Sequence, residues 1–209
     1  MRIGLSMYGT TFSMGIHPKA ARPAWHWKQV MDRASASGLE GVEIPASLLR
    51  GEDPSEIGRE AERRGHFICL DTSGHDPDEL GRVLELGAKV GAITVRTVIG
   101  GADFGGDRRP LAGRWNAFME EVRKGLEQAA RTADRLKVNL AVENHQDLAS
   151  EDLLWLCESI GSPRFGITFD TGNPLATAEE PLEFARRVAP HVKNVHLKDY
   201  YVYYSEEGY

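Results

Sequence analysis

The chain has 209 residues, of which 41% are hydrophobic and 27% charged, and its formal net charge is -6. This composition is typical of a globular protein with one substantial core, so a single domain spanning 1–209 is expected. An acidic balance without a run of Lys or Arg argues against a nucleic-acid surface, and no apolar stretch is long enough for a membrane span. Cys69 and Cys157 lie in apolar stretches, as in proteins of a reducing compartment, which favours a cytoplasmic location.

Short apolar stretches alternate with amphipathic ones along the whole chain, which is the pattern of a parallel α/β fold. Strands are predicted over residues 2–8, 41–45, 66–71, 92–98, 138–143, 165–170 and 192–197. Helices are predicted over residues 24–37, 54–64, 77–90, 113–136, 150–160 and 179–189. Asp76 before Pro77 marks a helix start, and helix ends are marked by Gly38, Gly65, Gly91 and Gly161.

Polar side chains stand at or beside the ends of most predicted strands: Glu43, Asp71, Arg96, Glu143, Asp170 and His196. In an open doubly wound sheet a ligand contacts mainly one switch point, whereas the strand ends of a barrel all converge on one mouth. The predicted fold class is therefore α/β, a (β/α)8 TIM barrel. A typical barrel takes roughly 250 residues and eight strands. With seven strands predicted, the barrel is expected to be incomplete, truncated before its eighth strand.

Three of these polar residues belong to the last three predicted strands. Glu143 and Asp170 are 27 residues apart, and Asp170 and His196 are 26 apart, one β-α unit each. Neighbouring parallel strands lie about 4.8 Å apart, so the three side chains can meet. Any one of them alone would more simply be a helix cap or an ion-pair partner. Together, two carboxylates and one imidazole suit a divalent ion such as Mn²⁺, Co²⁺, Mg²⁺ or Zn²⁺, which would also relieve the repulsion between the carboxylates.

Three stretches, "AVENHQDL", "GITFDTGNPL" and "VKNVHLKDY", resemble motifs of the xylose isomerase-like TIM barrels, a superfamily of sugar phosphate isomerases, epimerases and related enzymes. The resemblance extends over essentially the whole chain. It implies that Glu143, Asp170 and His196 bind one divalent metal ion, with Mn²⁺ as the first expectation. The fourth ligand of the family is a Glu on the eighth strand. Glu206 and Glu207 follow His196 too closely to be that residue.

The resemblance implies a metal-dependent isomerase or epimerase of a small sugar or keto-sugar, working through a metal-stabilised enediolate with Glu143 as a catalytic group. His145 lies two positions after Glu143, on the same side of an extended chain. It is the second catalytic candidate, as a general base, and the alternative for it is a hydrogen-bond donor near the metal.

Five residues are candidate substrate contacts. Lys198 shares a strand face with His196 and could meet a substrate oxygen, and Arg96 would suit an anionic group. Glu43 is expected at the barrel mouth, although it and Arg96 could equally form a salt bridge there. His17 lies in the long loop 9–23 and could close over the substrate, and Asn173 follows the metal-binding Asp by three positions.

Asn173 also keeps a second reaction open, because epimerases of this superfamily commonly carry a His at that position. The combination of "ENH" and "DTGNPL" looks like members that act on 3-oxo sugars, the C-glycoside deglycosidases and 3-oxo-isoapionate decarboxylases. The alternative is therefore a lyase on the same scaffold with His145 as base.

Other readings are less favoured. A DNA-cleaving AP endonuclease needs more His ligands and a surface for nucleic acid. A non-catalytic or partner-dependent subunit, working in a homo- or hetero-oligomer, would not need the metal. The expected partner is a small sugar, not nucleic acid or a membrane.

Overall fold

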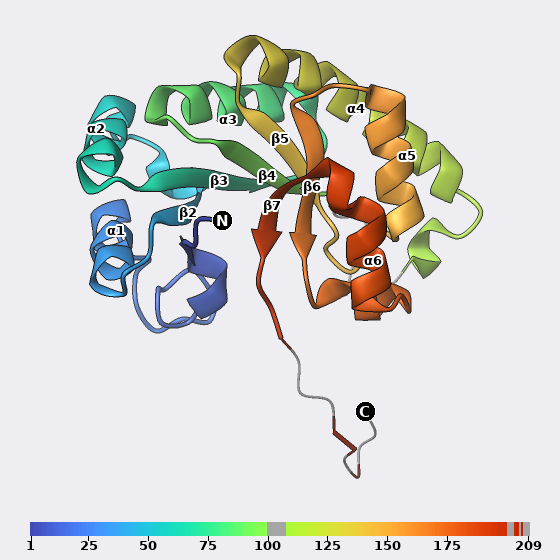
Figure 1. The fold of residues 1–209 in the computed structure, drawn as a ribbon, viewed down its shortest axis with the longest axis horizontal. Coiled ribbons are helices and arrows are strands. Elements are labelled where there is room, and N and C mark those ends of the chain that lie inside the picture. The colour runs from blue at the N-terminus through green and yellow to red at the C-terminus, as the bar shows by residue number, and fades with distance from the viewer. Residues whose placement is uncertain (100–107, 200–202, 205, 207–209) are drawn as a thin grey trace.

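The computed structural model describes residues 1–99, 108–199, 203–204 and 206. In this part of the chain, seven parallel strands form one sheet in chain order (Figure 1). They are β1 (Leu5–Ser6), β2 (Gly41–Pro45), β3 (Phe67–Ser73), β4 (Thr94–Val98), β5 (Asn139–Glu143), β6 (Phe165–Asp170) and β7 (Val192–His196). The sheet is curled, and the helices cover its outer face. On the inner face lies a hollow lined by residues of the strands. The predicted class, a TIM barrel represented by seven strands, is confirmed.

Within the described residues, six α-helices connect the strands: α1 (Trp27–Ala36), α2 (Pro54–Arg64), α3 (Pro77–Val90), α4 (Trp115–Leu136), α5 (Ser150–Ile160) and α6 (Pro181–Val188). Short 3₁₀ helices lie beside them: η1 (Met7–Thr10), η2 (Ala46–Leu49), η3 (Arg109–Leu111), η4 (Asn173–Thr177) and η5 (Ala189–His191).

The helices form where the sequence provides an apolar stripe and matching ends, as α3 shows. Leu80, Leu84 and Val90 are buried against the sheet, spaced as one face of a helix requires. The Asp76 side chain accepts hydrogen bonds from the first-turn backbone N–H groups, and Gly91 ends the helix with a left-handed φ of 72°. Only a residue without Cβ adopts that backbone readily, so the capping prediction for α3 is confirmed.

The first strand covers only Leu5–Ser6 of the predicted 2–8, and it ends early because the chain turns at Ser6. The Ser6 hydroxyl accepts a hydrogen bond from the backbone N–H of Tyr8 at 3.3 Å, and this bond begins η1. A serine that bonds to nearby backbone competes with ladder pairing, which explains the early end of the strand. As a result Tyr8 lines the interior hollow instead of extending the sheet.

The register of the sheet brings the polar strand ends to one level. Asp71 pairs with Arg96 between β3 and β4, and Asp170 pairs with His196 between β6 and β7. Since side chains alternate along a strand, residues paired in this way face the same side of the sheet. The curled sheet therefore collects these side chains inside the hollow, near the carboxyl-terminal ends of its strands.

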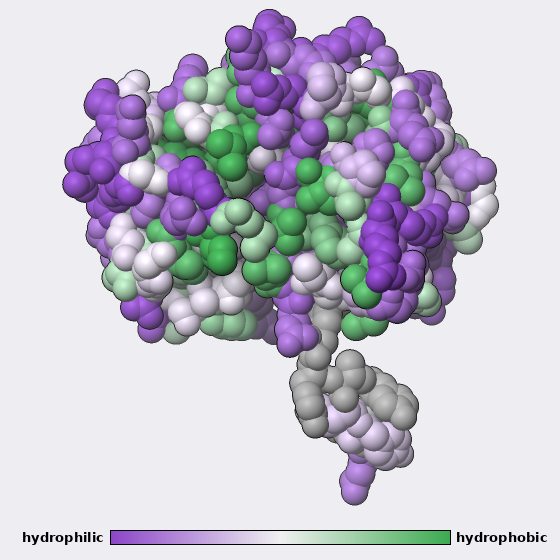
Figure 2. All heavy atoms as spheres, in the orientation of Figure 1, coloured by the Kyte–Doolittle hydropathy of each residue, from purple (hydrophilic) through white to green (hydrophobic). Residues whose placement is uncertain are grey.

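Among the described strands, β1 and β7 each pair with one neighbour. Hydrophobic side chains near these two edges remain exposed: Ile3 by 47%, Val195 by 39% and Leu197 by 70%. In the view of Figure 2, hydrophobic residues gather towards the middle of the molecule and hydrophilic residues surround them. Within the described residues, no helix has the length and apolar character needed to cross a membrane.

Candidate metal centre

The strand ends open into a cavity of about 1590 Å³. It is lined by Glu143, His145, Asp170, His196 and Lys198, together with residues of the other strands. These five residues come from the ends of β5, β6 and β7 or from the segments that follow them directly. The carboxyl-terminal ends of barrel strands are where ligand sites are built in this architecture, so the cavity is the candidate site.

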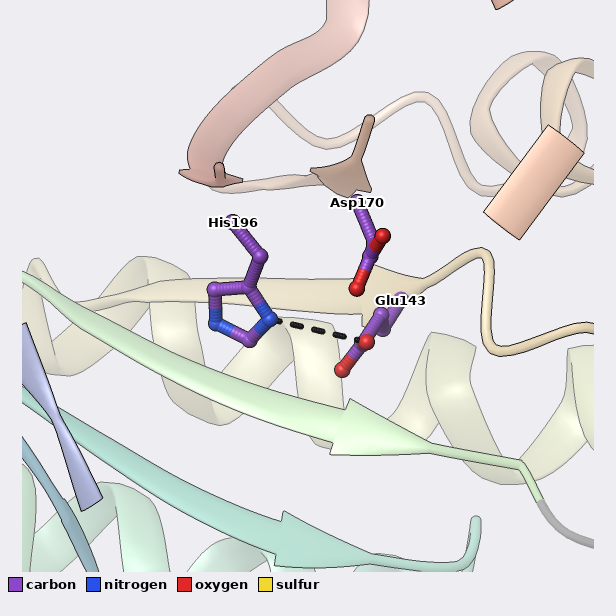
Figure 3. A group of neighbouring side chains, drawn as sticks. All are labelled: Glu143, Asp170 and His196. Carbon is purple, nitrogen blue, oxygen red and sulfur yellow. Dashed lines mark ion pairs between the residues drawn. The ribbon is translucent and has the colours of Figure 1, made fainter. Parts of the chain in front are cut away.

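Three of the lining side chains form one compact donor group. Glu143, Asp170 and His196 each offer a ligand atom, and these atoms lie within 4.8 Å of one another. Figure 3 shows the three side chains converging from neighbouring strands. The two carboxylates are each only 2% exposed. Two carboxylate oxygens and one imidazole nitrogen are a donor set that suits a divalent ion of intermediate hardness, so the residues present fit such an ion.

Asp170 is held by hydrogen bonds from its own loop and from Asn144, the residue directly after β5. Its Oδ1 accepts the backbone N–H groups of Gly172 at 3.0 Å and Asn173 at 3.3 Å. The Asn144 side chain accepts the Asp170 backbone N–H at 2.7 Å and donates to the Asp170 carbonyl at 3.0 Å. Asn144 thereby fixes the end of β6 against the end of β5, and the carboxylate has little freedom to move.

Lys198 lies against the same carboxylate from the segment after β7. Its Nζ is 2.7 Å from Asp170 Oδ2 and donates to Asn173 Oδ1 at 3.0 Å. The backbone of Lys198 is fixed by two hydrogen bonds with the Thr171 hydroxyl. The ammonium group therefore stands at the edge of the donor group, facing the cavity.

Arg96 on β4 is the counter-ion of Glu143. Its Nε lies 3.0 Å from Glu143 Oε2, although its N–H is not aligned with that oxygen for a hydrogen bond. Its Nη2 lies 4.0 Å from Glu43 Oε1, and the Tyr8 ring covers the guanidinium at 5.1 Å. Of the two interpretations of Arg96, an ion pair within the barrel thus has geometric support, because two carboxylates of the chain already occupy it.

The two acidic neighbours of His196 shape its protonation. Burial alone would lower the pKa of His196, but hydrogen bonds and charge from Glu143 and Glu43 raise that pKa to about 10. Burial, the largest influence on Glu143, would raise its pKa, yet His196 and Arg96 together leave the pKa of Glu143 below its usual value. Without a metal ion, the imidazole is therefore protonated at neutral pH and neutralises part of the acidic cluster.

Asp71 is a further buried carboxyl group in the wall of the cavity, besides Glu143 and Asp170. It is 3% exposed, and its Oδ2 has no hydrogen-bond partner among the described residues. Burial raises the pKa of Asp71 to about 7, and the charge of Arg96 only partly opposes this. The folded state therefore holds the Asp71 proton more tightly than an unfolded chain does.

This raised pKa predicts how stability changes with pH. Between about pH 4 and pH 7 the folded state binds more protons at Asp71 than the unfolded state, so stability falls as the pH rises through that range. We expect Asp71→Asn to be about 1–3 kcal/mol more stable than the parent at pH 8 and equally stable near pH 4. Urea unfolding at both pH values measures this difference. If the stability difference between the variant and the parent were the same at both pH values, the prediction would be wrong.

The remaining candidates lie at different depths. His145 is exposed at the cavity wall, where a bound molecule could reach it. Glu43 and Asn173 are buried and, within the described part of the chain, do not line the cavity. The His17 ring stacks on Phe12 with ring centres 4.0 Å apart, away from the cavity lining.

Some residues at the site are not singled out by the sequence pattern. Asn144 stands inside "ENH", and a polar amide directly after a buried strand is the signal that could have identified it. Ser6 and Asn194 donate hydrogen bonds to Glu43 from positions 37 and 151 residues away, at 2.9 and 3.2 Å. Such distant partners leave no local pattern, so only the folded chain reveals them.

The sequence model of one family, the xylose isomerase-like TIM barrels, matches residues 31–206. The chain belongs to this family. Among solved structures, 3-keto-D-glucoside 4-epimerase YcjR from E. coli has a similar fold, with a TM-score of 0.75 and 15% sequence identity, covering 95% of this chain and 79% of that one. The similarity supports the xylose isomerase-like fold described above.

Two curated relatives are longer than this xylose isomerase-like chain. The uncharacterized protein YihM of Escherichia coli (strain K12) is 25% identical over 205 residues, covering 93% of this chain and 58% of the relative. The 3-oxo-isoapionate decarboxylase of Pectobacterium atrosepticum is 26% identical over 181 residues, covering 87% of this chain and 58% of the relative. The chain therefore spans somewhat more than half the length of either protein.

Proposed function

We propose that this protein is a divalent-metal-dependent isomerase or epimerase of a small sugar or keto-sugar. The observation that carries the proposal is the donor group of Glu143, Asp170 and His196, whose ligand atoms lie within 4.8 Å of one another at the mouth of the barrel. Membership of the xylose isomerase-like family and the fold shared with a sugar epimerase support the same reaction class.

The donor group would hold one ion, with Mn²⁺ as the first expectation and Mg²⁺, Co²⁺ or Zn²⁺ as alternatives. When bound there, such an ion supplies Lewis-acid polarisation of a sugar carbonyl and its neighbouring hydroxyl. Because His196 is held protonated by its two carboxylate neighbours, it must release a proton before it can act as a ligand.

The chain's own groups would move the substrate proton. The Glu143 carboxylate faces the cavity and is kept ionised, so it can accept a proton from the carbon next to the carbonyl. The exposed His145 at the same wall is the second candidate base. Lys198 is placed to contact a substrate oxygen through its ammonium group, beside Asp170.

A lyase acting on a 3-oxo sugar is the second candidate function. Two observations favour it: Asn173 follows Asp170 by three positions and accepts a hydrogen bond from Lys198, and one curated relative is a 3-oxo-isoapionate decarboxylase. In this reaction His145 would act as the base. Bond cleavage would then replace the return of the proton to carbon.

Metal content tests the shared basis of both reactions. Protein purified without chelator is expected to contain about one divalent ion per chain by mass spectrometry. Asp170→Ala is expected to lose it, because that carboxylate is fixed in the donor group. The matched control is Asp32→Ala, which removes an exposed carboxylate paired with Arg64 on the helical surface and should leave metal content unchanged. A parent protein that takes up none of Mn²⁺, Mg²⁺, Co²⁺ and Zn²⁺ when each is added would refute the proposal.

Two readouts on one substrate panel separate the reactions. Ketoses and 3-oxo sugars are incubated with the metal-loaded protein in D₂O. An isomerase or epimerase introduces deuterium at carbon and conserves the carbon skeleton, whereas a lyase releases a fragment. Absence of both outcomes across the panel, with metal bound, would favour the reading of a non-catalytic subunit.

A further inference from the structure

The His196 imidazole is held between two carboxylates that belong to opposite sides of the hollow. Its Nδ1 lies 3.5 Å from Glu143 Oε1, on the side of the donor group (Figure 3). Its Nε2 lies 2.9 Å from Glu43 Oε2 on β2. The two ring nitrogens are therefore in different surroundings: Nδ1 faces the donor group, and Nε2 faces Glu43 on the other side.

Glu43 is placed to accept hydrogen bonds. The Ser6 hydroxyl donates to its Oε1 at 2.9 Å, and the Asn194 amide donates to its Oε2 at 3.2 Å. The Arg96 guanidinium lies 4.0 Å from Oε1. A carboxylate surrounded by donors has only acceptor oxygens to offer, so the Nε2 of His196 must be the donor in their contact.

Glu43 also lies outside the cavity lining. The residue is buried, at 5% exposed, and the cavity wall is formed by other described residues. Any effect of Glu43 on the candidate site must therefore pass through the residues that it touches, and of these His196 is the one in the donor group.

We propose that Glu43 is a positioning residue of the metal centre: it accepts the Nε2–H of His196 and so leaves the Nδ1 lone pair facing Glu143 and Asp170. An imidazole binds a metal through its unprotonated nitrogen, and the hydrogen bond at the other nitrogen selects the tautomer and the ring orientation. Ser6 and Asn194 in turn hold the Glu43 carboxylate in place. This role rests on the proposed metal site and replaces direct substrate contact as the function of Glu43.

The test is the metal affinity of Glu43→Gln, measured by calorimetric titration with Mn²⁺ and Co²⁺ on folded protein. Loss of the carboxylate is expected to weaken binding about 10–100-fold, as for other partners of metal-bound histidines. The visible absorption of the Co²⁺-loaded protein should change too, because a neutral amide oxygen accepts the Nε2–H more weakly than a carboxylate and orients the ring less firmly. Neither readout depends on turnover.

The matched control is Glu52→Gln. Glu52 makes the same kind of contact, with its Oε2 3.2 Å from His26 Nε2, but in the turn before α2, away from the cavity lining. Its replacement is expected to leave Mn²⁺ and Co²⁺ affinity unchanged. A second variant, Ser6→Ala, keeps the Glu43 carboxylate and removes one of its hydrogen bonds. It should weaken metal binding by about twofold to tenfold and remains informative if Glu43→Gln does not fold.

The outcomes separate the two proposals. If the parent binds the ion and Asp170→Ala does not, but folded Glu43→Gln binds it within about twofold of the parent, Glu43 is merely a structural counter-ion of Arg96 and the inference is wrong. If the parent itself binds no ion, the metal site fails and the inference fails with it.

Discussion

Glu143→Gln is expected to reduce the rate of the reaction by about 10²–10⁴-fold, the usual range for loss of a positioned proton-transfer group. Glutamine has the same length and keeps an oxygen beside Arg96, so the fold should survive. It cannot accept the substrate proton, and as a neutral ligand it also holds a divalent ion less strongly. The measurement is kcat on the substrate identified in the panel, at saturating metal, with circular dichroism to confirm the fold.

The control for this variant is Glu183→Gln. Glu183 is a glutamate on α6 whose side chain is 64% exposed and pairs with Arg186 one helical turn away. Its replacement should leave both kcat and metal affinity unchanged. A Glu143→Gln protein that retains the parent rate at saturating metal would exclude Glu143 from proton transfer.

Arg96→Met is expected to lower the free energy of unfolding of the metal-free protein by about 3–5 kcal/mol, as removal of one member of a buried ion pair generally does. Arg96 is 5% exposed, and it faces both Glu143 and Glu43. Methionine fills a similar volume but leaves these carboxylates without their guanidinium. Urea unfolding at pH 7 in the presence of a chelator gives the difference.

An exposed pair provides the comparison. Arg186→Met breaks the contact with Glu183 on the surface of α6, where the arginine side chain is 61% exposed, and should cost less than about 1 kcal/mol. If the free energy of unfolding falls by less than about 1 kcal/mol in both variants, the buried ion pair does not stabilise the fold. In that case Arg96 would serve the protein when metal or substrate is bound.

The candidate donor group could be anticipated because it follows from local order in the sequence. Glu143, Asp170 and His196 are each the last residue of a strand, and the parallel topology carries successive strand ends to neighbouring positions. The repeat of one strand and one helix sets that spacing without reference to distant parts of the chain. The structure accordingly brings these three side chains together.

What the sequence does not reveal depends on contacts across the hollow. Glu43 and His196 are 153 residues apart, and their hydrogen bond exists because the sheet curls and brings β2 to face β7. The side chain of His17 is placed by stacking on Phe12, a loop contact that no periodicity encodes. The short first strand has a similar cause, since the Ser6 hydroxyl diverts the backbone into a turn. Curvature and loop packing are tertiary effects, and strand patterns contain no measure of either.

Asn144 makes two hydrogen bonds with the backbone of Asp170. They restrain the carboxylate ligands more than the His196 imidazole. These bonds join the ends of β5 and β6 into one rigid unit, so the distance between the Glu143 and Asp170 carboxylates should change little during thermal fluctuations of the barrel. His196 stands on β7, which pairs only with β6 among the described strands. Its imidazole is restrained by two side-chain contacts, with Glu43 on the far side of the cavity and with Glu143. Thermal motion at this site should therefore be concentrated in the imidazole, and the carboxylates supply a nearly rigid frame against which it moves.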